Sequence, residues 1–442
     1  MKNSFFIKIA FVLTAFNSKT VAQTLTLKQC INQAVNNNIQ VKQSGLLVEN
    51  AEVNLSQAKS NLLPDLNGNY SYGFNQGRSV DPITNSYINQ QLYSSGFGLN
   101  SGIIIYNGLR LKNLIQQNAN TLEANKLDFQ QAKDNLTLNV ILAYLQVLSS
   151  EDVLETSKKQ LESTQKQVER MSIMVKQGTA GNYQLADLKA QQASEQVNIM
   201  TVENNLQQAK LSLCQLLNMP FNPKIQLERN DKNLEMQEYT TSAQSVFKTA
   251  QQNLALIKAF GFKIKSAENA IKVAHAGMLP QLSFNANLGS SFSSLAKDNK
   301  NENIGYLRQM NNNLGTFAGL NLQVPIFNNF QIKNRVKQAE IALKNTKLDL
   351  ESNEWQLRQN IEQAWLNMNT TFARYKVLQE QVKYLEESFR AADLRFTNGT
   401  INPTELLIIK NNFDRAKINL TQAKYEYAFR TKLLDFYQGK SL

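Results

Sequence analysis

The chain has 442 residues, with 47 Lys and Arg against 35 Asp and Glu, and a formal net charge of +12. It holds only 18 Gly and 7 Pro but 54 Asn and 42 Gln, a composition that excludes collagen-like, mucin-like and disulfide-rich scaffolds. One histidine, His275, and two cysteines are too few ligands for a zinc, haem or iron–sulfur centre, so we expect no metal and no cofactor.

The sequence also argues against an enzyme and against a nucleic-acid-binding protein. It contains no Gly-rich phosphate loop and no nucleophile elbow. Its Lys and Arg residues are spread among acids along the chain, and no basic cluster interleaved with aromatic residues occurs. We therefore expect neither catalysis nor a nucleic-acid partner.

Residues 1–22 have the pattern of a secretory signal peptide. Lys2 and Lys8 flank an apolar run, and the small residues Thr20 and Ala22 stand three and one places before a plausible cleavage point. No later stretch reaches 18 uninterrupted apolar residues, the length that a membrane-spanning helix needs. If the exported chain enters a bilayer, it must therefore do so with strands.

The rest of the chain is a tandem repeat. An ungapped match at an offset of 221 residues aligns Gly98-Leu99-Asn100 with Gly319-Leu320-Asn321, and upstream of it the offset becomes 216. The repeats are predicted over 23–217 and 241–442. Between them, 218–240 is predicted to be a linker near mid-height, because it contains two prolines and mixed charge.

Each repeat contains one very long predicted helix. The windows 109–177 and 330–398 contain neither Gly nor Pro. Their apolar residues recur every three or four positions, as on one face of a helix. At 1.5 Å per residue, each helix would be roughly 100 Å long, which favours a coiled-coil-like arrangement. Tight turns at Gly178 and Gly399 would lead into shorter helices. The four shorter predicted helices cover 27–62, 182–217, 242–279 and 403–437.

Two strands precede each long helix. Polar and apolar residues alternate over about 65–76 and 92–106 in the first repeat, and over about 281–293 and 313–327 in the second. Strands of 11 to 14 residues reach roughly 36 to 46 Å, enough to cross a bilayer. Four strands cannot close a barrel, and an open edge in lipid leaves backbone groups unpaired, so we expect the chain to oligomerise. The alternative is a periplasmic coiled-coil protein with two ordinary hairpins.

Three motifs, in their order and spacing, resemble the outer-membrane efflux (TolC) proteins. They are Leu62-Leu63-Pro64 before the first strand, Val324-Pro325-Ile326-Phe327-Asn328 after the fourth, and Arg395-Phe396-Thr397-Asn398-Gly399-Thr400 at the second turn. The resemblance covers essentially the whole mature chain. It implies a mainly α-helical homotrimer with a twelve-stranded outer-membrane β-barrel, continued by a periplasmic α-helical barrel.

The resemblance also implies function and partners. It predicts a passive exit duct of a tripartite efflux pump or type I secretion system, localised to the outer membrane with a large periplasmic portion. A periplasmic adaptor (membrane fusion) protein would join it to an inner-membrane pump of RND or ABC type, and its strands would contact outer-membrane lipid. The competing hypothesis is a periplasmic adaptor or structural scaffold without a membrane barrel.

The family resemblance assigns roles at the two turns. Gly178-Thr179 and Gly399-Thr400 fall where the family docks its adaptor, although glycine there is equally explained by a turn that needs positive φ. At the periplasmic gate of the family, Phe396 would occupy the position of an aromatic residue and Glu405 the position of an acidic residue. Ile401 and Ile408 depart from the family pattern, since a basic and an acidic residue are expected there. Asp187 is the repeat equivalent of Ile408, so Glu405 and Asp187 would place six carboxylates around a trimeric aperture. Solvated acids on helix faces are the alternative.

The two cysteines are predicted to lie near each other. Cys30 is in the first turn of one short helix and Cys214 in the last turn of another, and the ends of these helices should abut. An oxidising periplasm permits a disulfide between them, and two buried unpaired thiols are the alternative.

Overall fold

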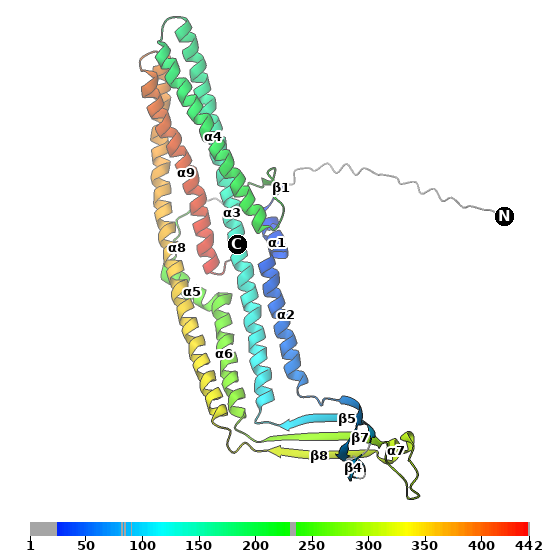
Figure 1. Cartoon of the computed structure of the whole chain (residues 1–442). Coiled ribbons are helices and arrows are strands. Elements are labelled where there is room, and N and C mark those ends of the chain that lie inside the picture. Colours follow the sequence, from blue (N-terminus) through cyan, green and yellow to red (C-terminus); the bar gives the residue numbers. More distant parts are fainter. Residues whose placement is uncertain (1–23, 81–82, 84, 90, 230–235, 441–442) are drawn as a thin grey trace, which may run out of the picture. The chain divides into compact units, whose positions relative to one another are not determined.

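A computed structural model describes residues 24–80, 83, 85–89, 91–229 and 236–440. The predicted signal peptide lies outside these residues. The chain divides into two compact units, one with Asp134–Thr240 and Ala364–Leu434 together with the segment up to Ile39, the other with Gln40–Lys133, Thr241–Gln363 and the segment after Leu434. Both long helices pass through both units (Figure 1).

The two long helices lie within their predicted windows. Helix α3 covers Arg110–Lys176 and helix α8 covers Gln331–Thr397, so each begins and ends one residue inside the window predicted for it. The helices that follow the turns, α4 over Asn182–Leu216 and α9 over Pro403–Tyr437, are 35 residues each. The long helix and the helix after the turn therefore have the same lengths in both halves of the molecule.

The remaining short helices are broken, and the breaks repeat. The predicted helix 27–62 is divided into α1 at Leu27–Asn37 and α2 at Ile39–Ser60, and 242–279 into α5 at Ala243–Asn253 and α6 at Ala255–Ala276. The residues between the helices, Asn38 and Leu254, have nearly the same extended backbone, with ψ of 129° and 133°. Neither break contains glycine or proline, so the residue types at these positions did not predict it.

The first unit contains the turns and the linker. The linker forms a short strand, β6 at Gln226–Leu227, which pairs in parallel with β1 at Thr24–Leu25. The Tyr144 hydroxyl of α3 has one proton, which it shares between the carbonyl of Glu228 at 2.6 Å and that of Leu25 at 3.2 Å, and so fixes this small sheet against the helix. The sequence predicted a linker here but not this strand, because two residues are too few to show the alternation of a strand.

The second unit contains the four long strands and the helices next to them. Helix α6 packs on the first half of α3, where the hydroxyls of Thr121 and Ser266 lie 2.9 Å apart and Lys263 lies 2.9 Å from Asp128. Helix α2 packs on the same part of α3, where a Cβ added at Gly45 would lie 3.6 Å from the ring of Phe129, an ordinary van der Waals contact.

A four-stranded antiparallel sheet completes this unit, in the order β2-β5-β7-β8. Its strands are β2 at Asn67–Asn75, β5 at Leu92–Tyr106, β7 at Gln281–Ser293 and β8 at Gly315–Gln323. β8 is shorter than predicted because Pro325 cannot donate to the ladder. The loop before β8 contains helix α7 at Tyr306–Asn312, and the first hairpin loop contains the small pair β3 at Arg78–Val80 and β4 at Tyr87–Asn89.

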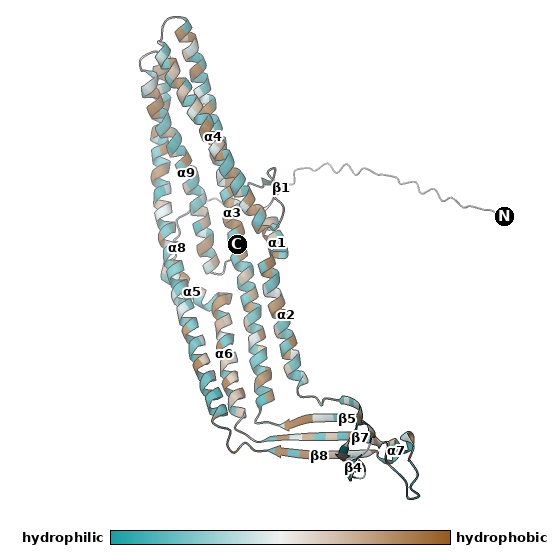
Figure 2. Cartoon of the chain, viewed as in Figure 1, coloured by the Kyte–Doolittle hydropathy of each residue, from teal (hydrophilic) through white to brown (hydrophobic). Residues whose placement is uncertain are grey.

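Hydropathy varies over short distances along the helices, which mix hydrophilic and apolar residues throughout (Figure 2). Among the described residues, none of the helices combines the length and the apolar character that a membrane span requires.

Candidate functional site: the amphipathic sheet and the two tip turns

The sheet has one apolar face. Cross-strand pairs on it include Leu99 with Leu288, Ile103 with Phe284 and Phe284 with Leu320. Many of these side chains are exposed, including Leu320 at 66% and Leu322 at 63%. A sheet that presents leucine and phenylalanine outward on a face with little protein cover is unusual for a water-soluble chain and typical of a surface that meets lipid or another protein.

The opposite face of the sheet is lined by amide side chains. Asn100 on β5 donates to the Oδ1 of Asn69 on β2 at 3.0 Å, and Asn287 on β7 donates to the Oδ1 of Asn100. These bonds form an amide row across three strands. On β8, the residue paired with Asn287 is Phe317, so an aromatic ring rather than an amide stands next in the row. The Phe317 side chain is 64% exposed. Phe317 packs over Gly319, where an added Cβ would lie 2.7 Å from the ring. It breaks the alternation that predicted an all-polar face.

Aromatic side chains gather at both ends of the strands. At the hairpin end, the rings of Phe74 and Tyr93 lie 5.2 Å apart, and those of Phe292 and Tyr306 lie 4.9 Å apart. At the end next to the helices, Phe327 and Phe330 meet edge to face at 5.7 Å. Aromatic girdles at both ends of an apolar band are a feature of membrane strands.

Helix α7 lies on the apolar face at the hairpin end. Its Tyr306 ring packs against Phe292 in a tilted arrangement, and the Ser290 hydroxyl donates to the carbonyl of Met310 at 2.7 Å. Helix α7 covers two serines of this face, Ser290 and Ser95, and both are buried. The apolar face left open is thus the part of the sheet between the serines and the helices.

The two predicted turns have the same geometry. Gly178 and Gly399 have φ of +73° and +71°, the left-handed conformation that ends a helix, and no atom lies within 4 Å of an added Cβ. The amides of Thr179 and Thr400 donate to carbonyls five residues earlier, at 3.0 and 2.9 Å. These bonds are those of a helix-ending turn, so the turn by itself accounts for both glycines.

The structure corrects the role of Phe396. Its side chain is 3% exposed and belongs to an apolar cluster with Met171, Leu188 and Leu406. A side chain so enclosed within its own subunit cannot line an aperture in this conformation. Ile401, at 8% exposure, belongs to the same cluster, which explains an apolar residue where a basic one was expected.

The two acids assigned to the gate are exposed. Asp187 lies near the start of α4 and Glu405 in the first turn of α9. The backbone amide of Glu405 donates to the side-chain oxygen of Asn402 at 2.8 Å, and its carboxylate lies 3.7 Å from the guanidinium of Arg395 on α8. The basic partner of Glu405 is therefore Arg395, which sequence reasoning missed because the two residues are ten apart across a turn.

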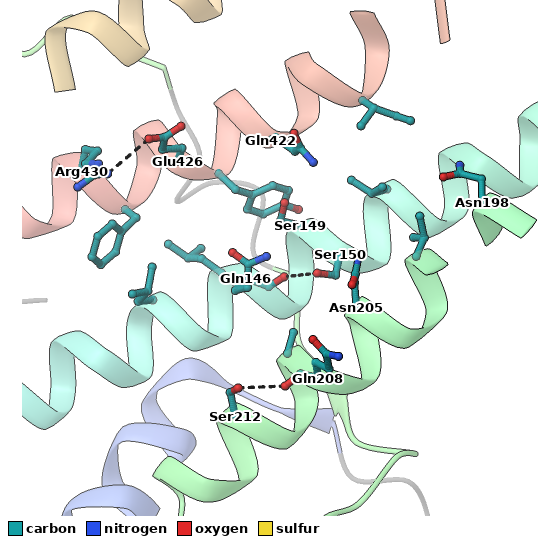
Figure 3. A pocket seen from close by; sticks show the side chains of 18 residues that line it. Gln146, Ser149, Ser150, Asn198, Asn205, Gln208, Ser212, Gln422, Glu426 and Arg430 are labelled. Atoms are coloured by element: carbon teal, nitrogen blue, oxygen red, sulfur yellow. Dashed lines mark hydrogen bonds and ion pairs between the residues drawn. The ribbon is translucent and has the colours of Figure 1, made fainter. Parts of the chain in front are cut away.

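A groove of about 880 Å³ lies in the first unit between α3, α4 and α9 (Figure 3). Its labelled polar side chains are amides and hydroxyls plus one ion pair, Arg430 with Glu426 at 3.4 Å. The hydroxyls of Ser150 and Ser212 donate to carbonyls of their own helices, at 2.9 and 3.0 Å. These groups offer hydrogen bonds rather than an activated nucleophile. In the described part of the chain, no group of three or more His, Cys, Asp or Glu side chains is placed to hold a metal ion.

Both cysteines are buried free thiols. They lie where predicted, in the first turn of α1 and the last turn of α4. Burial raises the pKa of Cys30, and the nearby Cys214 adds a smaller contribution. The disulfide proposed from the sequence is absent, and the alternative of two unpaired thiols describes the structure.

These features define a class of protein: a tandem repeat of long helical hairpins that carries a four-stranded sheet with one apolar and one amide-lined face. The chain matches the outer membrane efflux protein family over residues 30–219 and 243–439, and it belongs to that family.

Individual relatives agree with this assignment. The outer membrane protein TolC of Escherichia coli K12 is 24% identical over 429 residues, which are 97% of this chain and 84% of that protein. Among solved structures, the chain is similar to CusC, with a TM-score of 0.80 and 16% identity over 96% of each chain. It is also similar to the open state of the Neisseria gonorrhoeae outer membrane channel MtrE, with a TM-score of 0.74 and 17% identity over 93% of this chain and 88% of that one. The fold predicted from the sequence is confirmed by these likenesses.

Proposed function

We propose that the chain is the outer-membrane exit duct of a tripartite efflux pump or type I secretion system. The observation that carries the proposal is the sheet, whose apolar face and amide-lined face suit lipid on one side and water on the other. The aromatic pairs at both strand ends would lie at the two membrane–water interfaces.

The open edges of this sheet explain why the proposed unit is a homotrimer. β2 and β8 are edge strands, and each has one unpaired side. Unpaired backbone groups in lipid cost several kcal/mol each, so edge strands of neighbouring copies must pair. Three copies of a four-stranded sheet supply twelve strands, a number that can enclose a lumen. The amide row would then face the lumen, with one Phe317 at each seam between copies.

The helices would form the periplasmic part of the duct. The exposed Gly178-Thr179 and Gly399-Thr400 turns are the proposed contact points for a periplasmic adaptor, which would connect the duct to an inner-membrane pump of RND or ABC type. The duct itself would be passive and not an enzyme, so the pump supplies the energy. Asp187 and Glu405 are proposed to line the entrance at the tip, whereas Phe396 supports the tip by packing.

Expression in a two-membrane bacterium tests the proposal. We expect the protein in the outer-membrane fraction as a detergent-resistant trimer that dissociates on heating, and we expect stable ion conductance after insertion into planar bilayers. A monomer found in the periplasmic fraction, without conductance, would contradict the proposal and favour the adaptor or scaffold hypothesis.

A further inference from the structure

A buried charged cluster joins α4 to α9. The amine of Lys410 on α9 lies 2.9 Å from the Oε1 of Glu195 on α4 and 2.7 Å from the Oδ2 of Asp414, one turn further along α9. Lys410 is 1% exposed, and the two carboxylate side chains are 11% and 16% exposed. Burying three charges costs several kcal/mol per ion before their attraction offsets it, so the cluster is not explained as a simple gain in stability.

The two carboxylates of the cluster have different environments. Oε1 of Glu195 accepts three hydrogen bonds, from Thr164 on α3 at 3.0 Å, Gln191 at 2.9 Å and Lys410. Asp414 has Lys410 as its close partner. Burial raises the pKa of Asp414, and the positive charge of Lys410 lowers it. The negative charge of Glu195 raises it further and the positive charge of Lys417 lowers it, and the net result is a raised pKa. Burial thus outweighs the attraction of Lys410, and the folded protein favours the protonated form of Asp414.

The cluster occurs once in the repeat. The positions equivalent to Lys410, Asp414 and Glu195 at the offset of 221 residues are Lys189, Ala193 and Ala416. Although α4 and α9 are repeat equivalents of the same length, the cluster thus has no counterpart in which the two helices exchange roles. Thr164 belongs to a buried polar face of α3 that includes Gln160 and Gln167, each with a buried amide atom that has no hydrogen-bond partner.

We propose that Glu195, Lys410 and Asp414 form a proton-binding site that strengthens the packing of α4 on α9 as the pH falls. With both acids ionised, the cluster carries one excess negative charge in a poorly solvated place. A proton on Asp414 removes this excess and leaves the pair of Lys410 with Glu195. Because the folded state binds this proton more tightly than the unfolded state, the stabilisation is present at acidic pH and is lost as the pH rises through the raised pKa of Asp414.

Hydrogen exchange on the full-length oligomer tests the proposal. Exchange protection of the α9 amides between Leu406 and Ile418, corrected for intrinsic exchange, is measured from about pH 4.5 to pH 8. We expect about a five-fold loss of protection in the wild type over this range, and less than about a two-fold loss in Asp414→Asn, which mimics the protonated acid. Glu203→Gln, which removes an exposed ion pair of α4 with Lys158, should behave as the wild type.

A second variant probes the same site by another route. Burial is the main cause of the raised pKa of Asp414, and Glu195→Gln removes the negative charge that adds to it, so the loss of protection should move to more acidic pH. The proposal is overturned if Asp414→Asn retains the wild-type pH dependence, or if Glu203→Gln abolishes it as well. None of these outcomes depends on conductance, so the test is independent of the proposed transport function.

Discussion

The guanidinium of Arg395 lies 3.7 Å from the carboxylate of Glu405, across the turn that joins α8 to α9. Both side chains are about half exposed, so the pair is solvated and contributes little to stability. Its consequence is electrostatic, because Arg395 partly neutralises the acid that was assigned to the gate. The charge presented at the tip thus depends on both residues and on Asp187.

The carboxylates at the tip should affect ion selectivity. In planar bilayers, Glu405→Gln combined with Asp187→Asn is expected to lower the preference for cations by about two-fold, because six negative charges leave the proposed aperture while Arg395 stays. The measurement is the reversal potential in a salt gradient. Glu162→Gln, which removes an exposed acid paired with Lys166 on α3, is the control. Equal reversal potentials for the double variant and the wild type would remove Asp187 and Glu405 from the gate.

Phe396 should matter for stability rather than for conductance. Phe396→Ala leaves a cavity in the apolar cluster with Met171 and Leu188, and is expected to lower the free energy of unfolding by about 3–5 kcal/mol. Tyr183→Ala, at a side chain that is 70% exposed, should change it by less than about 0.5 kcal/mol. Denaturant unfolding measures both changes. A Phe396→Ala variant with unchanged stability and altered conductance would instead show that Phe396 acts at the gate.

The turn glycines allow a matched comparison of backbone effects. Gly178→Ala places an alanine at a φ of +73° and should destabilise the protein by about 1 kcal/mol, although no atom obstructs the new Cβ. Gly261→Ala, inside helix α6 and equally unobstructed, should instead stabilise it by about 1 kcal/mol. Thermal unfolding of the two variants gives the signs. The same sign for both would show that backbone conformation does not decide the effect at the turn.

The thiol of Cys30 should be unreactive in the folded protein. Burial raises its pKa to about 11, so below that pH the thiolate that reacts with alkylating reagents is scarce. We expect no labelling by iodoacetamide at pH 8 and complete labelling of Cys30 and Cys214 after denaturation. The folded pKa lies above the unfolded value, so the associated stabilisation is present below the unfolded pKa and is lost as the pH rises towards 11. Mass spectrometry measures the labelling. A mass lower by two hydrogens would instead show the disulfide.

The sequence by itself determined the long helices, the helices after the turns, the four long strands and the order of these elements. Uninterrupted helical windows, glycines at the two turns and the alternation of polar and apolar residues in four segments are local properties, and each predicts its element without knowledge of the partner. The ends of α3 and α8 were therefore predicted to within one residue. The repeat added the equivalence of α4 and α9, because it is visible in the sequence as a constant offset.

The tertiary structure decided which side chains meet. Phe396 and Phe317 are both aromatic residues in otherwise regular patterns, yet the first is enclosed in a core and the second lies on an amide-lined face. The cluster of Glu195 with Lys410 joins residues that are 215 positions apart. Burial, pairing and charge state depend on what packs against a residue from elsewhere in the chain, and no local pattern carries that information.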